Sequence, residues 1–187
     1  MENISHIAVP YSKALFMLAE ERNILGDVWR DMLVISSLCN SNRDFLLMLK
    51  SPVINTEKKQ KIINAILKDV LTPVTMGFMR ILIDRKRESF IRDISIAFIE
   101  LYKDHMGILT TVVKTAVPVS DELRKQILEV MKTQTSGEVE LVEEVNKELI
   151  GGFLLQWKDK QYDASILKQI NDLRRETAAL NLYIKGF

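Results

Sequence analysis

The spacing of apolar residues changes once along this chain, close to Gly107. From Ile4 to Gly107, apolar side chains recur at intervals of three and four residues, the spacing that gathers them on one face of a helix. From Thr110 to Val117 the sequence reads TTVVKTAV, which is rich in the β-branched residues that favour strands. We therefore predict an α+β protein, with an N-terminal six-helix bundle in residues 1–107 and a small C-terminal α/β domain in residues 108–187.

Residues that typically begin and end helices mark the same boundaries. Thr72 precedes Pro73, a pairing of a capping hydroxyl with proline at the first helical position that predicts the start of a fifth helix. Thr56 is predicted to cap the fourth helix, and Ser120 the helix of the second half. Gly107 lacks a side chain and suits the left-handed residue that ends many helices, so we expect the sixth helix to stop there.

The segment 149–166, LIGGFLLQWKDKQYDASI, predicts a glycine turn, a strand, a hairpin and a helix start. Gly151 and Gly152 allow positive φ or a close backbone approach. The apolar run that follows them is too short for an isolated helix and suits a buried strand that turns back at 158–160. Asp163 is predicted to cap the last helix. A phosphate cradle is the functional alternative for the glycine pair, but neither GxxxxGK[ST] nor GxGxxG spacing is present.

Composition excludes some classes of function. The chain has 26 Lys and Arg against 25 Asp and Glu, a formal charge of +1, so no overall field attracts it to nucleic acid or to an anionic membrane. No apolar run approaches the roughly 18 residues of a membrane-spanning helix, and the first residues do not resemble a signal peptide. We expect a protein without membrane insertion that is made in the compartment where it works.

No set of residues in the sequence suggests catalysis or cofactor binding. His6, His105 and the single Cys39 cannot form a spaced Cys/His metal site, and Cys39 is expected to be a buried thiol. Adjacent glutamates diverge on a helix and alternate faces on a strand, which makes them solvated residues more readily than an acid–base couple. We predict no catalytic residues, no cofactor and no metal, with a site built from scattered carboxylates as the alternative.

Two basic clusters are candidates for nucleic-acid binding, and the alternative function is a nucleic-acid-binding α+β factor that uses the cluster at Arg80 to Arg87. Both clusters lie in the N-terminal half, and neither accompanies a glycine-aromatic RNA motif. They are Arg80, Arg85, Lys86 and Arg87, and Lys58, Lys59 and Lys61. The end of a helix also explains the first cluster, because positive charge there offsets the helix dipole.

The first and fifth helices carry more small and aromatic residues than a core requires. Tyr11, Ala14 and Phe78 belong to these stripes, and Ala14 would leave a shallow groove that could receive a helix from a partner. Packing of the same residues inside the bundle explains the pattern equally well. The residues alone leave both interpretations open.

Five segments together resemble the delta subunit of F-type ATP synthases, called the oligomycin-sensitivity-conferring protein in mitochondria. They are YSKALFMLA at 11–19, FLLMLKSPVI at 45–54, FMRILIDRKRE at 78–88, VKTAVPVS at 113–120 and VNKELIGGFLLQWKDKQYDASI at 145–166. LIGGF followed by DASI is the most specific of them. This chain has Asn146 and Lys147 where the family often has Asp-Pro, and Trp157-Lys158 where the family usually has a glycine turn.

The resemblance implies a non-catalytic stator subunit that resists rotor torque during proton-driven ATP synthesis. The helical domain would bind N-terminal helices of the alpha subunits in the catalytic head, and the C-terminal domain would bind b-type subunits of the peripheral stalk. It implies a peripheral position at the cytoplasmic face of the inner membrane, or an organelle-encoded equivalent, with no cofactor and no nucleic acid. The alpha-binding groove would lie between the first and fifth helices, at Tyr11, Ala14, Leu15 and Leu18 facing Phe78, Ile81 and Leu82.

Overall fold

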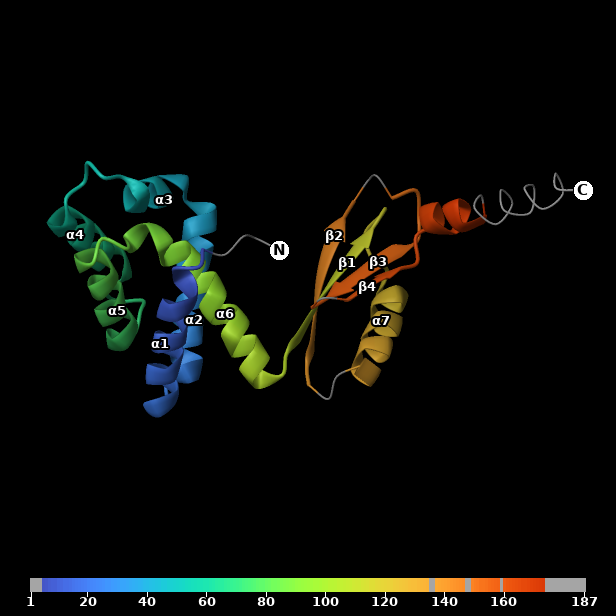
Figure 1. Cartoon of the computed structure of the whole chain (residues 1–187), viewed down its shortest axis with the longest axis horizontal. Coiled ribbons are helices and arrows are strands. Elements are labelled where there is room, and N and C mark those ends of the chain that lie inside the picture. Colours follow the sequence, from blue (N-terminus) through green and yellow to red (C-terminus); the bar gives the residue numbers. More distant parts are fainter. Residues whose placement is uncertain (1–4, 135–136, 147–148, 159, 174–187) are drawn as a thin grey trace, which may run out of the picture. The chain divides into compact units, whose positions relative to one another are not determined.

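A computed structural model describes residues 5–134, 137–146, 149–158 and 160–173. The chain divides into two compact units, unit 1 at Met1–His105 and unit 2 at Met106–Phe187 (Figure 1). Unit 1 is helical, and unit 2 contains the sheet. The predicted α+β class is confirmed.

The helices of unit 1 follow one another through short connections. They are α1 (Ala8–Glu21), α2 (Leu25–Ser41), α3 (Arg43–Lys50), α4 (Thr56–Leu67), α5 (Pro73–Asp84), the short 3-10 helix η1 (Glu88–Phe90) and α6 (Ile91–Met106). Their buried side chains form one hydrophobic core, in which Phe98, Met32, Met79 and Leu82 are among the largest fully buried residues. Removal of these apolar surfaces from water is the main source of stability for the unit.

Two of the predicted helix starts in unit 1 have different outcomes. Thr72 caps α5 as predicted, since its side chain accepts a hydrogen bond from the backbone N–H of Thr75. The prediction for α4 is wrong by one residue: Asn55 is the cap, with Oδ1 accepting from the N–H of Lys58 at 2.9 Å, and Thr56 is the first helical residue. Asparagine serves here because its side chain oxygen accepts a hydrogen bond as readily as a hydroxyl.

Unit 2 is a four-stranded sheet with α7 on one face (Figure 1). Its elements are β1 (Leu109–Thr115), α7 (Asp121–Gln134), β2 (Val139–Val145), β3 (Phe153–Trp157), β4 (Lys160–Asp163) and a helix over 166–173. The strand order is β2-β1-β3-β4. β1 pairs with β2 in parallel, across the α7 crossover, and the other neighbours are antiparallel. The predicted order of strand, helix, strand, hairpin and helix is confirmed.

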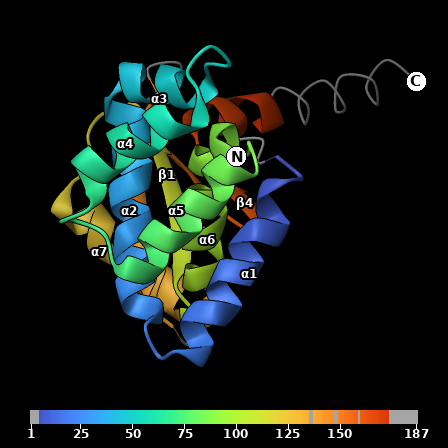
Figure 2. The same cartoon turned by 90° about the vertical axis from the view of Figure 1, so that its left-hand side faces the viewer.

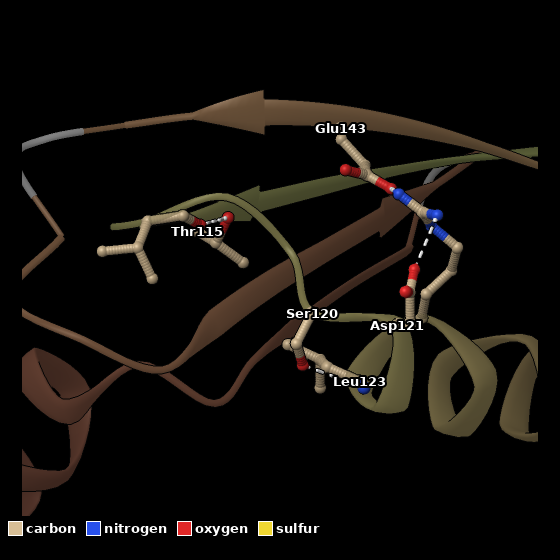
Figure 3. A network of polar contacts seen from close by, with 7 residues as sticks. Thr115, Ser120, Asp121, Leu123 and Glu143 are labelled. Atoms are coloured by element: carbon tan, nitrogen blue, oxygen red, sulfur yellow. Dashed lines mark hydrogen bonds and ion pairs between the residues drawn. The ribbon is translucent and has the colours of Figure 1, made fainter.

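Polar contacts fix the start of α7 relative to the sheet (Figure 3). The Ser120 hydroxyl accepts from the N–H of Leu123 at 3.3 Å, which confirms the predicted cap. The guanidinium of Arg124 reaches Asp121 on its own helix at 3.2 Å and Glu143 on β2 at 2.6 Å. Hydrogen bonding to Glu143 and the negative charge of that carboxylate raise the pKa of Arg124. These contacts orient α7 across the β1–β2 side of the sheet.

The glycine pair before β3 allows a close approach between two backbone segments. Gly152 has φ +79°, and a Cβ there would lie 2.3 Å from the carbonyl oxygen of Ala164. Gly151 accepts a hydrogen bond from the N–H of Ile166 at 3.0 Å. The predicted turn with close backbone approach is therefore confirmed, because no side chain fits where the last helix begins beside β3.

The cap of the helix over 166–173 differs from the prediction. Ser165 occupies the capping position, and its hydroxyl accepts from the N–H of Lys168 at 3.2 Å. Asp163 lies two residues earlier, where its Oδ1 accepts from the N–H of Ser165 at 2.9 Å. Hydrogen bonds donated by the Ser165 hydroxyl and by its backbone N–H lower the pKa of the Asp163 carboxyl. The aspartate therefore forms the turn that leads into the helix, and the serine caps it.

Candidate functional site

An apolar groove lies between α1 and α5, which run alongside each other in unit 1 (Figure 2). Its volume is about 320 Å³. The lining residues are Leu18 and Arg22 at the end of α1, and Pro73, Val74, Gly77, Phe78 and Ile81 of α5. The apolar residues form the walls, and Arg22 contributes a positive charge at the end of α1.

Gly77 lines this groove without a side chain to fill it. A Cβ built at Gly77 meets no atom within 4 Å, so the missing side chain leaves open space on this face of α5. Glycine in a helix interior costs about 1 kcal/mol relative to alanine. The sequence interpretation attributed the groove to Ala14 and missed Gly77, although a glycine inside an amphipathic pattern is the signal that could have identified it.

Of the seven residues predicted for the groove, three line it and two are buried elsewhere. Leu18, Phe78 and Ile81 line the hollow. Leu15 and Leu82 are 1 % and 0 % exposed, so their prediction as contact residues is wrong for the chain in this structure.

Helical phase explains the burial of Leu15 and Leu82. Leu15 shares a stripe with Ala8, Ser12 and Ala19, all buried and spaced four, three and four residues apart along α1. Leu82 belongs to the stripe of α5 that faces the core of unit 1. These stripes pack into unit 1, and the neighbouring stripes carry Leu18, Phe78 and Ile81, which line the hollow.

Tyr11 and Ala14 lie on α1 but do not line the hollow. Both precede Leu18 by one or two turns, at the seven- and four-residue spacings that share a helix face. Tyr11 packs partly against the core of unit 1, and Ala14 is exposed. Their part in binding stays a prediction.

The two basic clusters do not form a uniform positive surface. Lys59 is only 2 % exposed, and its Nζ donates to the carbonyl oxygen of Leu49 at 2.9 Å and to the carboxylate of Glu88 at 2.6 Å. This lysine therefore connects α3, α4 and η1 inside the unit. Arg85 and Lys86 follow α5 and are exposed, in the position where positive charge offsets the helix dipole.

The described residues offer little for metal, membrane or thiol chemistry. Within ranges 5–134, 137–146, 149–158 and 160–173, no three His, Cys, Asp or Glu side chains are grouped so that they could hold a metal ion. No helix in the described part of the chain has the length and apolar character needed to cross a bilayer. Burial raises the pKa of the Cys39 thiol to about 11, which leaves it protonated and unreactive at neutral pH.

Fold and groove together describe an α+β protein whose helical unit has an apolar hollow between α1 and α5. The model of the ATP synthase delta (OSCP) subunit family matches residues 7–176, and the chain belongs to this family. It is therefore a stator subunit of a membrane-associated ATP synthase complex and assembles with other subunits of that complex.

Individual relatives agree with the family. The chain is 30% identical over 172 residues to the ATP synthase subunit delta of Cytophaga hutchinsonii, with 92% of this chain and 94% of the relative covered. It is 35% identical over 166 residues to the same subunit of Christiangramia forsetii, covering 89% and 90%.

A solved structure shares the fold. It is the cryo-EM structure of the Toxoplasma gondii mitochondrial ATP synthase hexamer, with a TM-score of 0.73 at 18% identity, over 93% of this chain and 98% of the matched chain. None of these relatives supports the alternative of a nucleic-acid-binding factor.

Proposed function

We propose that this chain is a non-catalytic adaptor that links the catalytic head of an F-type ATP synthase to its peripheral stalk. Unit 1, with its six helices acting as one bundle, binds an N-terminal helix of an alpha subunit, and unit 2 binds b-type subunits of the stalk. The chain works at the cytoplasmic face of the inner membrane or at the organelle equivalent. The observation that carries this proposal is the apolar groove between α1 and α5.

The chemistry of the groove suits an amphipathic helix. Leu18, Phe78 and Ile81 offer apolar surface, and Ile81 is 55% exposed in the free chain, so a ligand that covers it removes apolar surface from water. Helices that bind grooves present apolar residues at three- and four-residue spacing. Arg22 favours a carboxylate at the end of the bound helix that lies nearest to it.

Substitution of Gly77 tests this proposal without removing a single contact of the core. Gly77→Leu places a side chain in open space inside the groove and also improves helix propensity. We expect the fold to survive and the affinity for a synthetic alpha N-terminal peptide to fall at least tenfold, measured by titration calorimetry with the full chain. Leucine at this position occupies the volume that the peptide needs.

Gly26 in α2 provides a matched control. A Cβ there also meets no atom within 4 Å, and Gly26 does not line the groove. Gly26→Leu is therefore expected to bind the peptide as the unmodified chain does. Equal affinity of the Gly77→Leu and Gly26→Leu chains, with both folded by circular dichroism, contradicts binding in this groove.

A further inference from the structure

A second apolar hollow lies in unit 2, between α7 and strands β3 and β4, with a volume of about 390 Å³. Its lining residues are Leu123, Gln126, Ile127, Val130 and Met131 of α7, and Phe153, Leu155, Trp157 and Tyr162 of the strands. Val130 and Tyr162 are 57% and 55% exposed, so the described residues leave much of this apolar surface in contact with water.

The size of the sheet explains why the hollow exists. Strands lie about 4.8 Å apart and a helix is about 10 Å wide, so one helix covers roughly two strands of a four-stranded sheet. The ion pair of Arg124 with Glu143 orients α7 toward β2. On this face, β3 and β4 therefore lack a second covering element among the described residues.

We propose that the C-terminal segment of the chain itself, residues 177–187, binds in this hollow. The segment reads TAALNLYIKGF and lies beyond residue 176, where the match to the family ends. It contains five large apolar residues, Leu180, Leu182, Tyr183, Ile184 and Phe187. Such a density of apolar side chains gains free energy when it covers apolar surface, and Phe153, Trp157 and Tyr162 supply that surface.

Charge and reach agree with this occupant. The segment carries Lys185 and no acidic residue. Glu122 and Glu129 are exposed and lie one turn before and after Gln126, which lines the hollow, so two carboxylates are available to Lys185 on α7, beside the exposed Lys125. The helix over 166–173 starts beside the hollow, because the N–H of Ile166 bonds to the carbonyl oxygen of Gly151, two residues before Phe153.

The chain is long enough to return to the hollow. Eight helical residues advance about 12 Å from the hollow, and the 14 residues after Leu173 (187 − 173) reach up to roughly 46 Å when extended. The inference goes beyond the proposed function, since it concerns the free chain and needs no subunit of the synthase.

Fluorescence of Trp157 gives the first test. The chain has two tryptophans, so Trp29→Phe leaves Trp157, which lines the hollow, as the only reporter. We expect a chain ending at Glu176, and a full chain with Leu180→Ser and Ile184→Ser, to show a red-shifted emission and at least twofold stronger iodide quenching. The matched control, Thr177→Ser with Asn181→Ser, is expected to leave both values unchanged.

Disulfide trapping gives the second test and identifies the occupant. Val130→Cys and Ile184→Cys introduce two thiols, while the native Cys39 is buried. Oxidation is expected to link them within one chain at a rate that does not depend on protein concentration. An unchanged Trp157 signal on truncation, or disulfides that form only between two chains, overturns the proposal, the latter in favour of a second copy as the occupant. Circular dichroism of each variant confirms that unit 2 is folded.

Discussion

Ile81 and Leu82 are neighbours in α5 with opposite surroundings, so their substitution separates binding from folding. Ile81 is 55% exposed and lines the groove, whereas Leu82 is fully buried in the core of unit 1. A fully buried Leu→Ala substitution removes transfer free energy and leaves a cavity, at a cost of about 2–5 kcal/mol. We therefore expect Leu82→Ala to destabilise unit 1 by about 3 kcal/mol, and Ile81→Ala by less than about 1 kcal/mol.

Thermal unfolding measures the first effect. For a domain of about 100 residues, 1 kcal/mol shifts the midpoint by roughly 4–8 °C, so Leu82→Ala should lower it by about 12–24 °C. Titration with the alpha peptide measures the second effect. Ile81→Ala should weaken binding by roughly 5- to 30-fold, about 1–2 kcal/mol, because truncation of an anchor in a groove removes apolar contact. A larger loss of stability for Ile81→Ala than for Leu82→Ala refutes the assignment of the two helix faces.

Three further predictions concern the backbone and the thiol. Gly152→Ala should lower the free energy of unfolding of unit 2 by at least about 3 kcal/mol in denaturant, since the new Cβ meets the backbone of Ala164. Gly151→Ala should cost less, because its Cβ meets only the flexible end of the Ile166 side chain. Lys158 has φ +47°, a conformation that glycine adopts more readily than other residues, so Lys158→Gly should stabilise unit 2 by about 0.5–1 kcal/mol while Lys158→Ala gives no gain. Cys39 keeps its proton up to about pH 11 in the folded chain, so the stability it contributes is complete below about pH 9 and is lost as pH rises toward 11. That loss is roughly 2–3 kcal/mol in the unmodified chain and should be absent from the stability curve of Cys39→Ala, with both chains measured by urea unfolding between pH 8 and 11.

Local signals predicted two of the four capping residues correctly, because a cap needs only residues within one turn. Thr72 and Ser120 belong to this class. The second contact of Thr72 could not be predicted, since its N–H and hydroxyl both donate to Asp31, 41 residues earlier, at 2.9 and 2.6 Å. The same limit applies to Lys59, which was interpreted as part of a surface cluster. Its burial depends on Glu88, and a partner 29 residues away leaves no periodic signal.

Leu15 and Leu82 were expected in the groove but are buried, and this difference has another cause. α5 carries apolar residues around most of its circumference, so periodicity shows that the helix is amphipathic without showing which stripe meets the core. Leu82 faces the core, and Phe78 and Ile81 line the groove, although all three belong to one apolar pattern. Only the packing of the neighbouring helices separates them. Gly77 can be assigned to the groove only once the space around α5 is known. A Cβ built there meets no atom within 4 Å, so the missing side chain leaves the groove open.

The corrected groove also limits how tightly unit 1 alone can bind. Three anchors, Leu18, Phe78 and Ile81, contribute roughly 1.5–3 kcal/mol each when fully buried, and association costs of about 4–15 kcal/mol offset much of that sum. A stator under torque therefore gains from a second attachment on the same chain, because a covalent link makes rebinding at the released end intramolecular, at an effective concentration in the millimolar range. Unit 2 provides that second attachment in the proposed function. It follows that cleavage of a protease site inserted between His105 and Leu109 should leave each unit able to bind its own partner while the head separates from the stalk. Retention of the head on the stalk after such cleavage would show that unit 1 binds far more tightly than its groove explains.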